Sequence, residues 1–270
     1  MLNKKKLLGV GITDATQQKI LEYLVKNLEN SSKKVFIVTP NPEILVFAKK
    51  NPEFKKVLNT ADLALCDGMG LVIAGKFLGK AFKERFTGTD FVEKACKEVS
   101  EKPITVGFLG GGPFVAEKTG DCLLSKYPSL KVVFTAEEWG EKGFILASNR
   151  GKTQNLKQNE SENQGQLSSV PSVPLSSVYS IDILFVAFGF PKQEEWIYQN
   201  LDNISVKAAI GVGGAFDYIS GKVPRAPKWV QALGFEWLYR LVVQPWRLKR
   251  QLALLEFIYL VLKERVRVIF

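Results

Sequence analysis

Hydrophobic positions along the chain fall into two alternating patterns. Short runs of β-branched or apolar residues, typical of buried strands, occupy residues 7–10, 35–38, 63–66, 104–109, 132–135, 181–188 and 208–212. Between these runs, apolar residues recur with helical spacing at residues 14–28, 43–50, 91–99, 115–127 and 192–201. We expect Asp14 and Gln17 to form a capping box at the start of the first helix.

Strands that alternate with helices form a mostly parallel sheet with helices on both faces. Residues 1–221 are therefore predicted to adopt an α/β, Rossmann-like fold. The alternation stops after residue 212, and residues 222–270 are rich in Trp, Leu and Arg, which predicts a helical C-terminal appendage. Pro245 should divide this appendage into two helices, because proline removes a backbone donor.

Residues 148–177 interrupt the alternation of strands and helices. They are rich in Ser, Asn, Gln and Gly and contain few apolar side chains. A segment of this composition does not bury enough apolar surface to order itself, so we expect a disordered insertion.

The positive charge of the chain is concentrated in the appendage. The net charge is +10, and residues 222–270 contain ten Lys or Arg against three Glu. The same segment contains Trp229, Trp237 and Trp246. This combination favours anionic groups bound beside an apolar surface, as at an anionic membrane. On charge alone, phosphorylated substrates and nucleic acid are alternatives.

No apolar run in the sequence is long enough to cross a membrane. The longest, residues 252–262, is interrupted by Glu256 and is far short of the roughly 20 residues that a spanning helix needs. The apolar run after the basic N-terminus is shorter than the roughly 7 to 15 residues of a secretory signal. Three cysteines without metal or redox spacing fit a reducing cytosol. We therefore expect a cytoplasmic protein that can lie on a membrane surface.

The chain contains no histidine, which excludes Ser-His-Asp and Cys-His catalysis. Proton transfer must then use a carboxylate, Lys, Tyr or Cys. Ligands of open parallel sheets bind beyond the carboxyl ends of the strands, and Asp67 follows the predicted strand at residues 63–66. Asp67 is the best placed general base, with Gly68 and Gly70 allowing a close approach of substrate. A simple glycine turn is the alternative.

Other polar side chains follow the ends of predicted strands. Thr39 and Asn41 stand among two prolines and can point at a ligand, although a rigid turn that caps the next helix is the alternative. Gln193, on the first turn of a helix, can face the same pocket. Arg85 can hold a phosphate in a bidentate manner; the alternative is that Thr89 caps a helix and Arg85 is solvated.

Two glycine clusters also follow strands. Gly110 and Gly111 precede a helix in the layout of an anion site, without a complete dinucleotide or P-loop motif. Gly213 and Gly214 repeat this arrangement after the last strand. The sequence lacks a D-x-D pair, by which transferases hold a metal on a nucleotide diphosphate. We therefore expect no metal and no cofactor, with a diphosphate held by Arg, Lys and backbone N–H groups.

Five blocks of sequence combine these features: TPNPE at 39–43, DGMG at 67–70, ERFTGTD at 84–90, FGFPKQEEWI at 188–197 and GVGGAFDYISGKVPRAPKW at 211–229. In this order and spacing they resemble the WecG/TagA/CpsF family of bacterial glycosyltransferases, over nearly the whole chain apart from residues 148–177. Teichoic-acid members of that family transfer N-acetylmannosamine from its UDP donor to undecaprenyl-diphosphate-linked N-acetylglucosamine, with inversion and at the cytoplasmic face of the membrane.

The resemblance implies a role for each candidate residue. Asp67 would deprotonate the acceptor hydroxyl, beside Arg85. The pocket for sugar and acceptor would be lined by Thr39, Asn41 and Gln193, and the diphosphate would be reached by Arg240, Arg247 and Arg250. The arginines of the appendage would stand on an element that docks only when lipid is present, which would restrain the enzyme in the cytosol.

The implied partners are a UDP-sugar, a lipid-diphosphate-linked acceptor and an anionic membrane surface at the inner face of the plasma membrane. The sugar is left open between N-acetylmannosamine and the sugars of other UDP-dependent family members, and a homo-oligomer is also left open. Residues 136–140 read AEEWG where family members commonly carry a His-Gly-Tyr-Phe-like turn, so the contact made by that turn does not carry over.

A nucleotide- or nucleic-acid-binding module is the alternative of a different class. The aromatic residues of the appendage have the helical, leucine-rich spacing of a packed or interfacial helix rather than that of a strand platform for single-stranded nucleic acid. We therefore expect no nucleic-acid partner.

Overall fold

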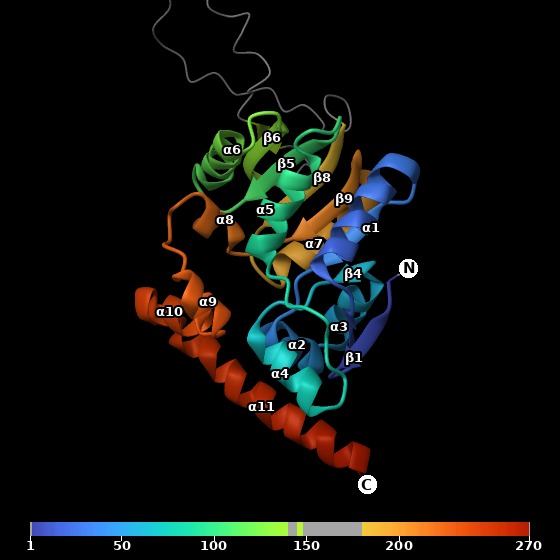
Figure 1. Ribbon diagram of the computed structural model, residues 1–270, viewed down its shortest axis with the longest axis vertical. Helices are drawn as coiled ribbons and strands as arrows, with labels where there is room; N and C mark the ends of the chain where they lie inside the picture. Colours follow the sequence, from blue (N-terminus) through green and yellow to red (C-terminus); the bar gives the residue numbers. More distant parts are fainter. Residues whose placement is uncertain (1, 140–144, 148–179, 270) are drawn as a thin grey trace, which may run out of the picture.

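The computed structural model describes residues 2–139, 145–147 and 180–269, so the predicted insertion at 148–177 lies outside the described residues. Within these ranges the strands form a seven-stranded sheet in the order β4-β3-β9-β8-β5-β6-β7 (Figure 1). The six strands from β4 to β6 are parallel, and β7 is antiparallel to β6 at the edge. Their bounds are β3 (Val35–Val38), β4 (Leu63–Ala64), β5 (Thr105–Gly110), β6 (Lys131–Trp139), β7 (Ile145–Ala147), β8 (Ile181–Ala187) and β9 (Val206–Gly211).

Helices cover both faces of this sheet, which confirms the predicted Rossmann-like α/β class. One face packs against α1 (Gln17–Asn30), α5 (Gly88–Val99), α6 (Val115–Lys126) and α8 (Ala215–Ile219). The other face packs against α2 (Pro42–Lys50), α3 (Pro52–Thr60), α4 (Met69–Phe77) and α7 (Lys192–Asn200). The central strand β8 is buried along its whole length, as its mostly apolar run predicts, and its one charged residue, Asp182, is paired with Lys207 at 2.8 Å.

The prediction of a first strand at residues 7–10 is wrong. These residues are the turn of an antiparallel hairpin between β1 (Lys4–Leu7) and β2 (Val10–Thr13), which forms a separate two-stranded sheet. The two residues between the strands, Leu8 and Gly9, both have positive φ (51° and 87°), as a tight primed turn requires. The hairpin lies beside β4, where the Ala64 N–H donates to the Thr13 hydroxyl at 2.9 Å.

Helix starts differ from the expected ones in two places. Thr16, rather than an Asp14 capping box, caps α1 by accepting from the Lys19 N–H. The Asp14 carboxylate is instead paired with the Lys5 ammonium at 2.8 Å. At α5 the capping residue is Thr87 rather than Thr89. The helices α3 and α4 have no counterpart among the sequence-based expectations.

The C-terminal appendage consists of α9 (Lys228–Ala232), α10 (Glu236–Val243), a short 3-10 turn (Pro245–Arg247) and α11 (Leu248–Ile269). The predicted break at Pro245 is confirmed, and a second break falls at Gly234, whose φ is +81°. Because that glycine faces the Met69 side chain, a β-carbon there would collide with it. Within the described residues no helix is both long and apolar enough to span a bilayer.

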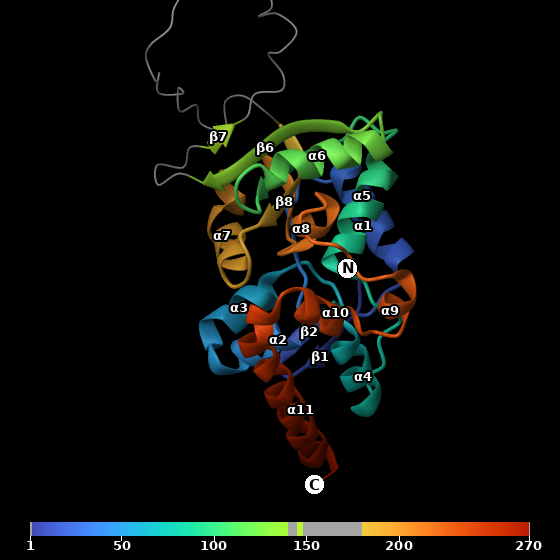
Figure 2. The same cartoon turned by 90° about the vertical axis from the view of Figure 1, so that its left-hand side faces the viewer.

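The appendage is packed on the α/β domain. In Figures 1 and 2, α11 runs along α2 beneath the sheet. Its residues Phe257 and Val261 are buried in the core of that side. Near the end of α11, the Glu264 carboxylate accepts from the Leu8 N–H at 3.1 Å and pairs with Lys80 at 2.8 Å. The appendage is therefore docked in this structure, and whether lipid is needed for docking in solution stays a prediction.

Candidate active site

One large cleft lies where the carboxyl ends of the parallel strands face the appendage. Its volume is about 1380 Å³. The loops after β3, β4, β5, β8 and β9 form one wall, and α10, the 3-10 turn and α11 form the other. Of the predicted site residues, all except Gly110 line this cleft: Thr39, Asn41, Asp67, Arg85, Gly111, Gln193, Gly213, Gly214, Arg240, Arg247 and Arg250.

Asp67 lies in the cleft immediately after the two-residue strand β4. Its own N–H donates to the Pro40 carbonyl at 3.2 Å, and its Oδ2 accepts a long hydrogen bond of 3.4 Å from the Gly88 N–H. Burial raises the pKa of Asp67 to about 7; the Gly88 bond opposes this rise, and the Glu236 carboxylate adds to it. A carboxyl group with this pKa can accept a proton near neutral pH.

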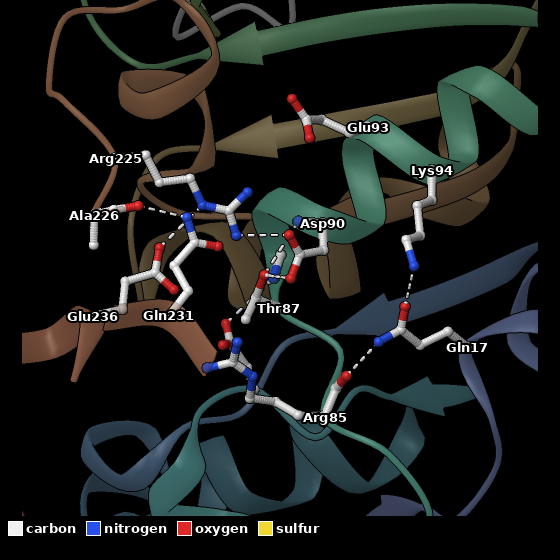
Figure 3. A network of polar contacts seen from close by, with 12 residues as sticks. Gln17, Arg85, Thr87, Asp90, Glu93, Lys94, Arg225, Ala226, Gln231 and Glu236 are labelled. Carbon is white, nitrogen blue, oxygen red and sulfur yellow. Dashed lines mark hydrogen bonds and ion pairs between the residues drawn. The ribbon is translucent and has the colours of Figure 1, made fainter. Parts of the chain in front are cut away.

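The loop between α4 and α5 is held by a network of polar contacts to the appendage (Figure 3). The Thr87 hydroxyl donates to the Asp90 carboxylate at 2.8 Å, and Arg225 pairs with Asp90 at 2.6 Å and with Glu236 at 3.1 Å. Arg85 belongs to this loop, and its carbonyl accepts from the Gln17 side chain at 2.6 Å. Arg225, which sequence reasoning did not single out, therefore joins α5 to the start of α10.

Gln193 is buried on the first turn of α7 and binds the glycine loop after β9. Its Oε1 accepts from the Gly213 N–H at 2.9 Å, and its Nε2 donates to the Glu194 carboxylate at 2.8 Å. A β-carbon at Gly211 would lie only 2.9 Å from the Gln193 Cγ, so glycine is required there by close packing. Glu194 is fully buried, and this burial raises its pKa to about 7.

Thr39 and Asn41 have structural partners in the loop after β3. The Asn41 Oδ1 caps α2 by accepting from the Ile44 N–H at 3.0 Å, which is the capping turn weighed as the alternative. The Thr39 hydroxyl donates to the Gly211 carbonyl at 2.9 Å and so joins the ends of β3 and β9. Both residues also line the cleft.

Replacing Thr39 with valine is expected to lower the free energy of unfolding by about 1 kcal/mol, because a buried hydrogen bond is lost without a change in volume. Thermal unfolding of the variant measures this loss. An unchanged unfolding temperature would contradict a structural contribution of the Thr39 hydroxyl. A raised KM at unchanged stability would assign the hydroxyl to substrate instead.

Three arginines of the appendage, those predicted to reach a diphosphate, line the cleft but differ in their partners. Arg240 pairs with Asp217 at 3.2 Å and lies 4.7 Å above the Tyr218 ring. Its guanidinium covers Gly214, where a β-carbon would lie 2.6 Å from the Arg240 Nη2. Arg250 forms a bidentate pair with the Glu43 carboxylate at 2.7 and 2.8 Å.

Arg247 differs from both of its neighbours. Among the described residues no carboxylate lies within ion-pair distance of it, and it donates only a long 3.5 Å bond to the Gln244 side chain. Burial, together with the nearby charges of Arg240 and Arg250, lowers its pKa to about 10. A half-buried cation without a carboxylate partner is well suited to an anionic ligand such as a diphosphate.

The segment after β5 is contacted by Glu137 of β6, a residue that the sequence reasoning did not assign. Gly110, Gly111 and Gly112 all have positive φ, between 83° and 102°. Beyond them, the Glu137 carboxylate accepts a short hydrogen bond from the Phe114 N–H at the start of α6, so a protein carboxylate occupies the helix N-terminus proposed for an anion. Glu137 lines the cleft and belongs to the AEEWG sequence at residues 136–140. The sequence signal for Glu137 was its position just beyond the predicted strand at residues 132–135.

The chemistry within reach of this cleft is proton abstraction by Asp67 beside cationic groups that can hold an anionic leaving group. The described residues contain no cluster of three or more acidic or thiol side chains that could hold a metal ion. A family model described as "Glycosyl transferase WecG/TagA/CpsF family" matches residues 5–269. The chain belongs to this family.

Membership in the WecG/TagA/CpsF family makes the protein a glycosyltransferase. Three similar relatives carry the name N-acetylglucosaminyldiphosphoundecaprenol N-acetyl-beta-D-mannosaminyltransferase. That of Bacillus spizizenii is 28% identical over 97% of this chain and 92% of its own length. That of Bacillus subtilis is 29% identical over 90% and 85%. That of Staphylococcus aureus strain MRSA252 is 27% identical over 98% and 94%.

Proposed function

We propose that this glycosyltransferase transfers N-acetylmannosamine from UDP-N-acetylmannosamine to N-acetylglucosamine linked to undecaprenyl diphosphate, with inversion, in the synthesis of a teichoic-acid-type polymer. The sugar and the acceptor are those in the names of its relatives. The observation that carries the proposal is that Asp67 and Arg247 line one cleft. They supply a base for the acceptor hydroxyl and a cation for a diphosphate.

The proposed reaction needs one base and no acid. The Asp67 carboxylate takes the proton of the acceptor hydroxyl while that oxygen attacks the anomeric carbon of the donor sugar. UDP leaves from the opposite face of the sugar as an anion, so it needs positive charge rather than a proton. Arg85 and the arginines of the appendage provide that charge. We propose that no metal ion is required.

The test is a donor and acceptor screen with the full chain. UDP release is measured for UDP-N-acetylmannosamine, UDP-N-acetylmannosaminuronate and UDP-N-acetylglucosamine, each with a lipid-diphosphate-linked N-acetylglucosamine acceptor. We expect release with the first donor only, dependent on acceptor and insensitive to EDTA, and a product of inverted anomeric configuration by NMR. Transfer from another donor would reassign the sugar, and EDTA-sensitive transfer would contradict the metal-independent mechanism.

We also propose that the protein works on the inner face of the plasma membrane. The appendage exposes several large apolar side chains, among them Trp229, Trp246, Leu252 and Leu255, next to its Lys and Arg residues. Such a surface binds anionic bilayers by apolar insertion and charge attraction.

Sedimentation with vesicles of phosphatidylglycerol tests this membrane contact. We expect binding that high salt weakens, and we expect Trp246→Ser to weaken it further at unchanged thermal stability, because the Trp246 side chain is 73% exposed. Equal sedimentation with neutral phosphatidylcholine vesicles would contradict the role of charge. Tyr198→Ser serves as a control, since Tyr198 is an exposed aromatic residue on α7 rather than on the appendage.

A further inference from the structure

The cleft continues from the polar site into an apolar arm between α4 and α11. The α4 wall is formed by Met69, Ile73 and Phe77, which are spaced four residues apart and so share one face of the helix. The α11 wall is formed by Leu254, Phe257, Ile258, Val261 and Leu262. We refer to the space between these two sets of residues as the α4–α11 groove.

The α4–α11 groove leaves apolar side chains exposed on both of its walls. Ile73 is 63% exposed and Phe77 46%, and across from them Ile258 is 48% and Leu262 50% exposed. Apolar surface gathered on two facing helices, rather than scattered, marks a binding site. Burial of this surface by an apolar ligand would be favourable.

Both walls begin at the polar groups of the site. The helix α4 starts two residues after Asp67, and α11 starts directly after Arg247. Their far ends also lie together, since the Arg265 guanidinium is 5.8 Å from the centre of the Phe77 ring. The two helices therefore run side by side away from the site, as Figure 1 shows. From Met69 to Phe77 the α4 wall extends about 12 Å, at 1.5 Å per residue.

This order of groups matches an amphiphile of one particular kind. A molecule with a sugar hydroxyl, a diphosphate and then a long apolar chain would meet Asp67, Arg247 and the groove in sequence. We infer that the α4–α11 groove binds the isoprene units next to the diphosphate of the polyprenyl acceptor. This inference rests on the proposed function and adds to it a binding site for the acceptor chain.

The outer face of α11 distinguishes this role from insertion into a bilayer. Leu252, Leu255 and Tyr259 are also exposed, between 59% and 66%, but none of them lines the cleft. A bilayer would contact these side chains, whereas a single chain held in the groove would not. Leu255 is therefore the matched control for Ile258 and Ile73.

The experiment compares two water-soluble acceptors in the absence of membranes: N-acetylglucosamine diphosphate esterified with farnesyl and with butyl. For the wild type we expect a KM for the farnesyl acceptor about tenfold or more below that for the butyl acceptor, from the apolar area that three isoprene units bury. Ile73→Asn and Ile258→Asn should each reduce this ratio severalfold. Leu255→Asn should leave the ratio unchanged. Thermal unfolding checks that the variants are folded.

A KM ratio that is the same in the Ile73→Asn variant as in the wild type would contradict binding of the acceptor chain in the α4–α11 groove. An equal fall of the KM ratio in Leu255→Asn would also contradict the inference, because it would indicate a general apolar effect of α11. Absence of transfer to either acceptor by the wild type would contradict the proposed function. In that case direct binding of farnesyl diphosphate tests the groove, and Ile73→Asn must weaken this binding if the inference holds.

Discussion

Replacing Asp67 with asparagine is expected to reduce sugar transfer by about 10²–10⁴-fold, the usual contribution of a positioned general base. The amide has nearly the same shape, so the Pro40 and Gly88 contacts can persist, and UDP should bind with unchanged affinity. Turnover by UDP release and UDP affinity by calorimetry measure the two quantities. Near-normal turnover of the variant would remove Asp67 from the mechanism.

The pH dependence of the wild type gives an independent test of the same group. Because burial raises the pKa of Asp67 to about 7, the reactive carboxylate is depleted below that pH. We expect kcat/KM to rise with pH through about 7 and then level off. The residual activity of Asp67→Asn should lack this dependence. A wild-type profile that is flat between pH 5 and 8 would contradict proton abstraction by this carboxyl group.

As the pH rises, the stability of the wild type should fall while its activity increases. The folded-state pKa of Asp67 lies above the value of about 3.9 in an unfolded chain, so the native state holds this proton to higher pH. The free energy of unfolding therefore falls as pH rises between these two values, and above pH 7 Asp67→Asn should be more stable than the wild type. Asp182→Asn is the control. Burial opposes the ionisation of Asp182, but hydrogen bonds from Lys207 and Thr105 outweigh it and lower the pKa of this carboxyl group. Loss of the carboxylate should therefore destabilise the protein.

The second large effect is expected for Arg247→Ala, which should lower turnover by about 10²-fold or more, as removal of one charge-stabilising group does in other enzymes. Arg247 is half-buried, and no carboxylate in the described part of the chain pairs with it, so the folded state loses little when it is removed. Because burial and its arginine neighbours disfavour its charge, the variant should unfold at the same or a higher temperature at pH 7. Steady-state kinetics and thermal unfolding measure both effects.

Arg240→Ala provides the contrast for Arg247→Ala. Arg240 is tied to Asp217 and to the Tyr218 ring, so its loss should lower stability as well as turnover. An unchanged rate in Arg247→Ala would show that this cation is not used by the reaction. Arg247→Lys keeps the charge but not the bidentate fork, and partial activity of that variant would indicate that charge is the larger contribution.

Much of the fold was predictable because the central strands are short, mostly apolar runs, as in β8. The hairpin turn at Leu8 and Gly9 was missed because the four apolar or glycine residues at 7–10 resemble a strand, while only backbone conformation distinguishes the turn. The helix α4 was missed for a different reason. It is apolar on its cleft face as well as on its core face, so it lacks the alternation that marks a surface helix.

The candidate site was predictable to the extent that it depends on strand ends. Thr39, Asp67 and Gln193 follow strands in sequence, and parallel strands bring such residues to one edge of the sheet. The pairing partner of each arginine in the appendage was not predictable, because it depends on the docking of α10 and α11 onto distant segments. That packing pairs Arg250 with Glu43 and leaves Arg247 without a carboxylate partner among the described residues, and no local pattern encodes it.

The short strand β4 has a consequence for how the site opens. Only two of its residues pair with β3, at the edge of the sheet, whereas β8 pairs on both sides along most of its length. Local unfolding at such an edge costs less free energy than global unfolding, so the segment that carries Asp67 can separate while the central sheet remains intact. The hairpin on one side and α4 on the other restrain it, so the precision of the proposed base depends on peripheral elements of the fold.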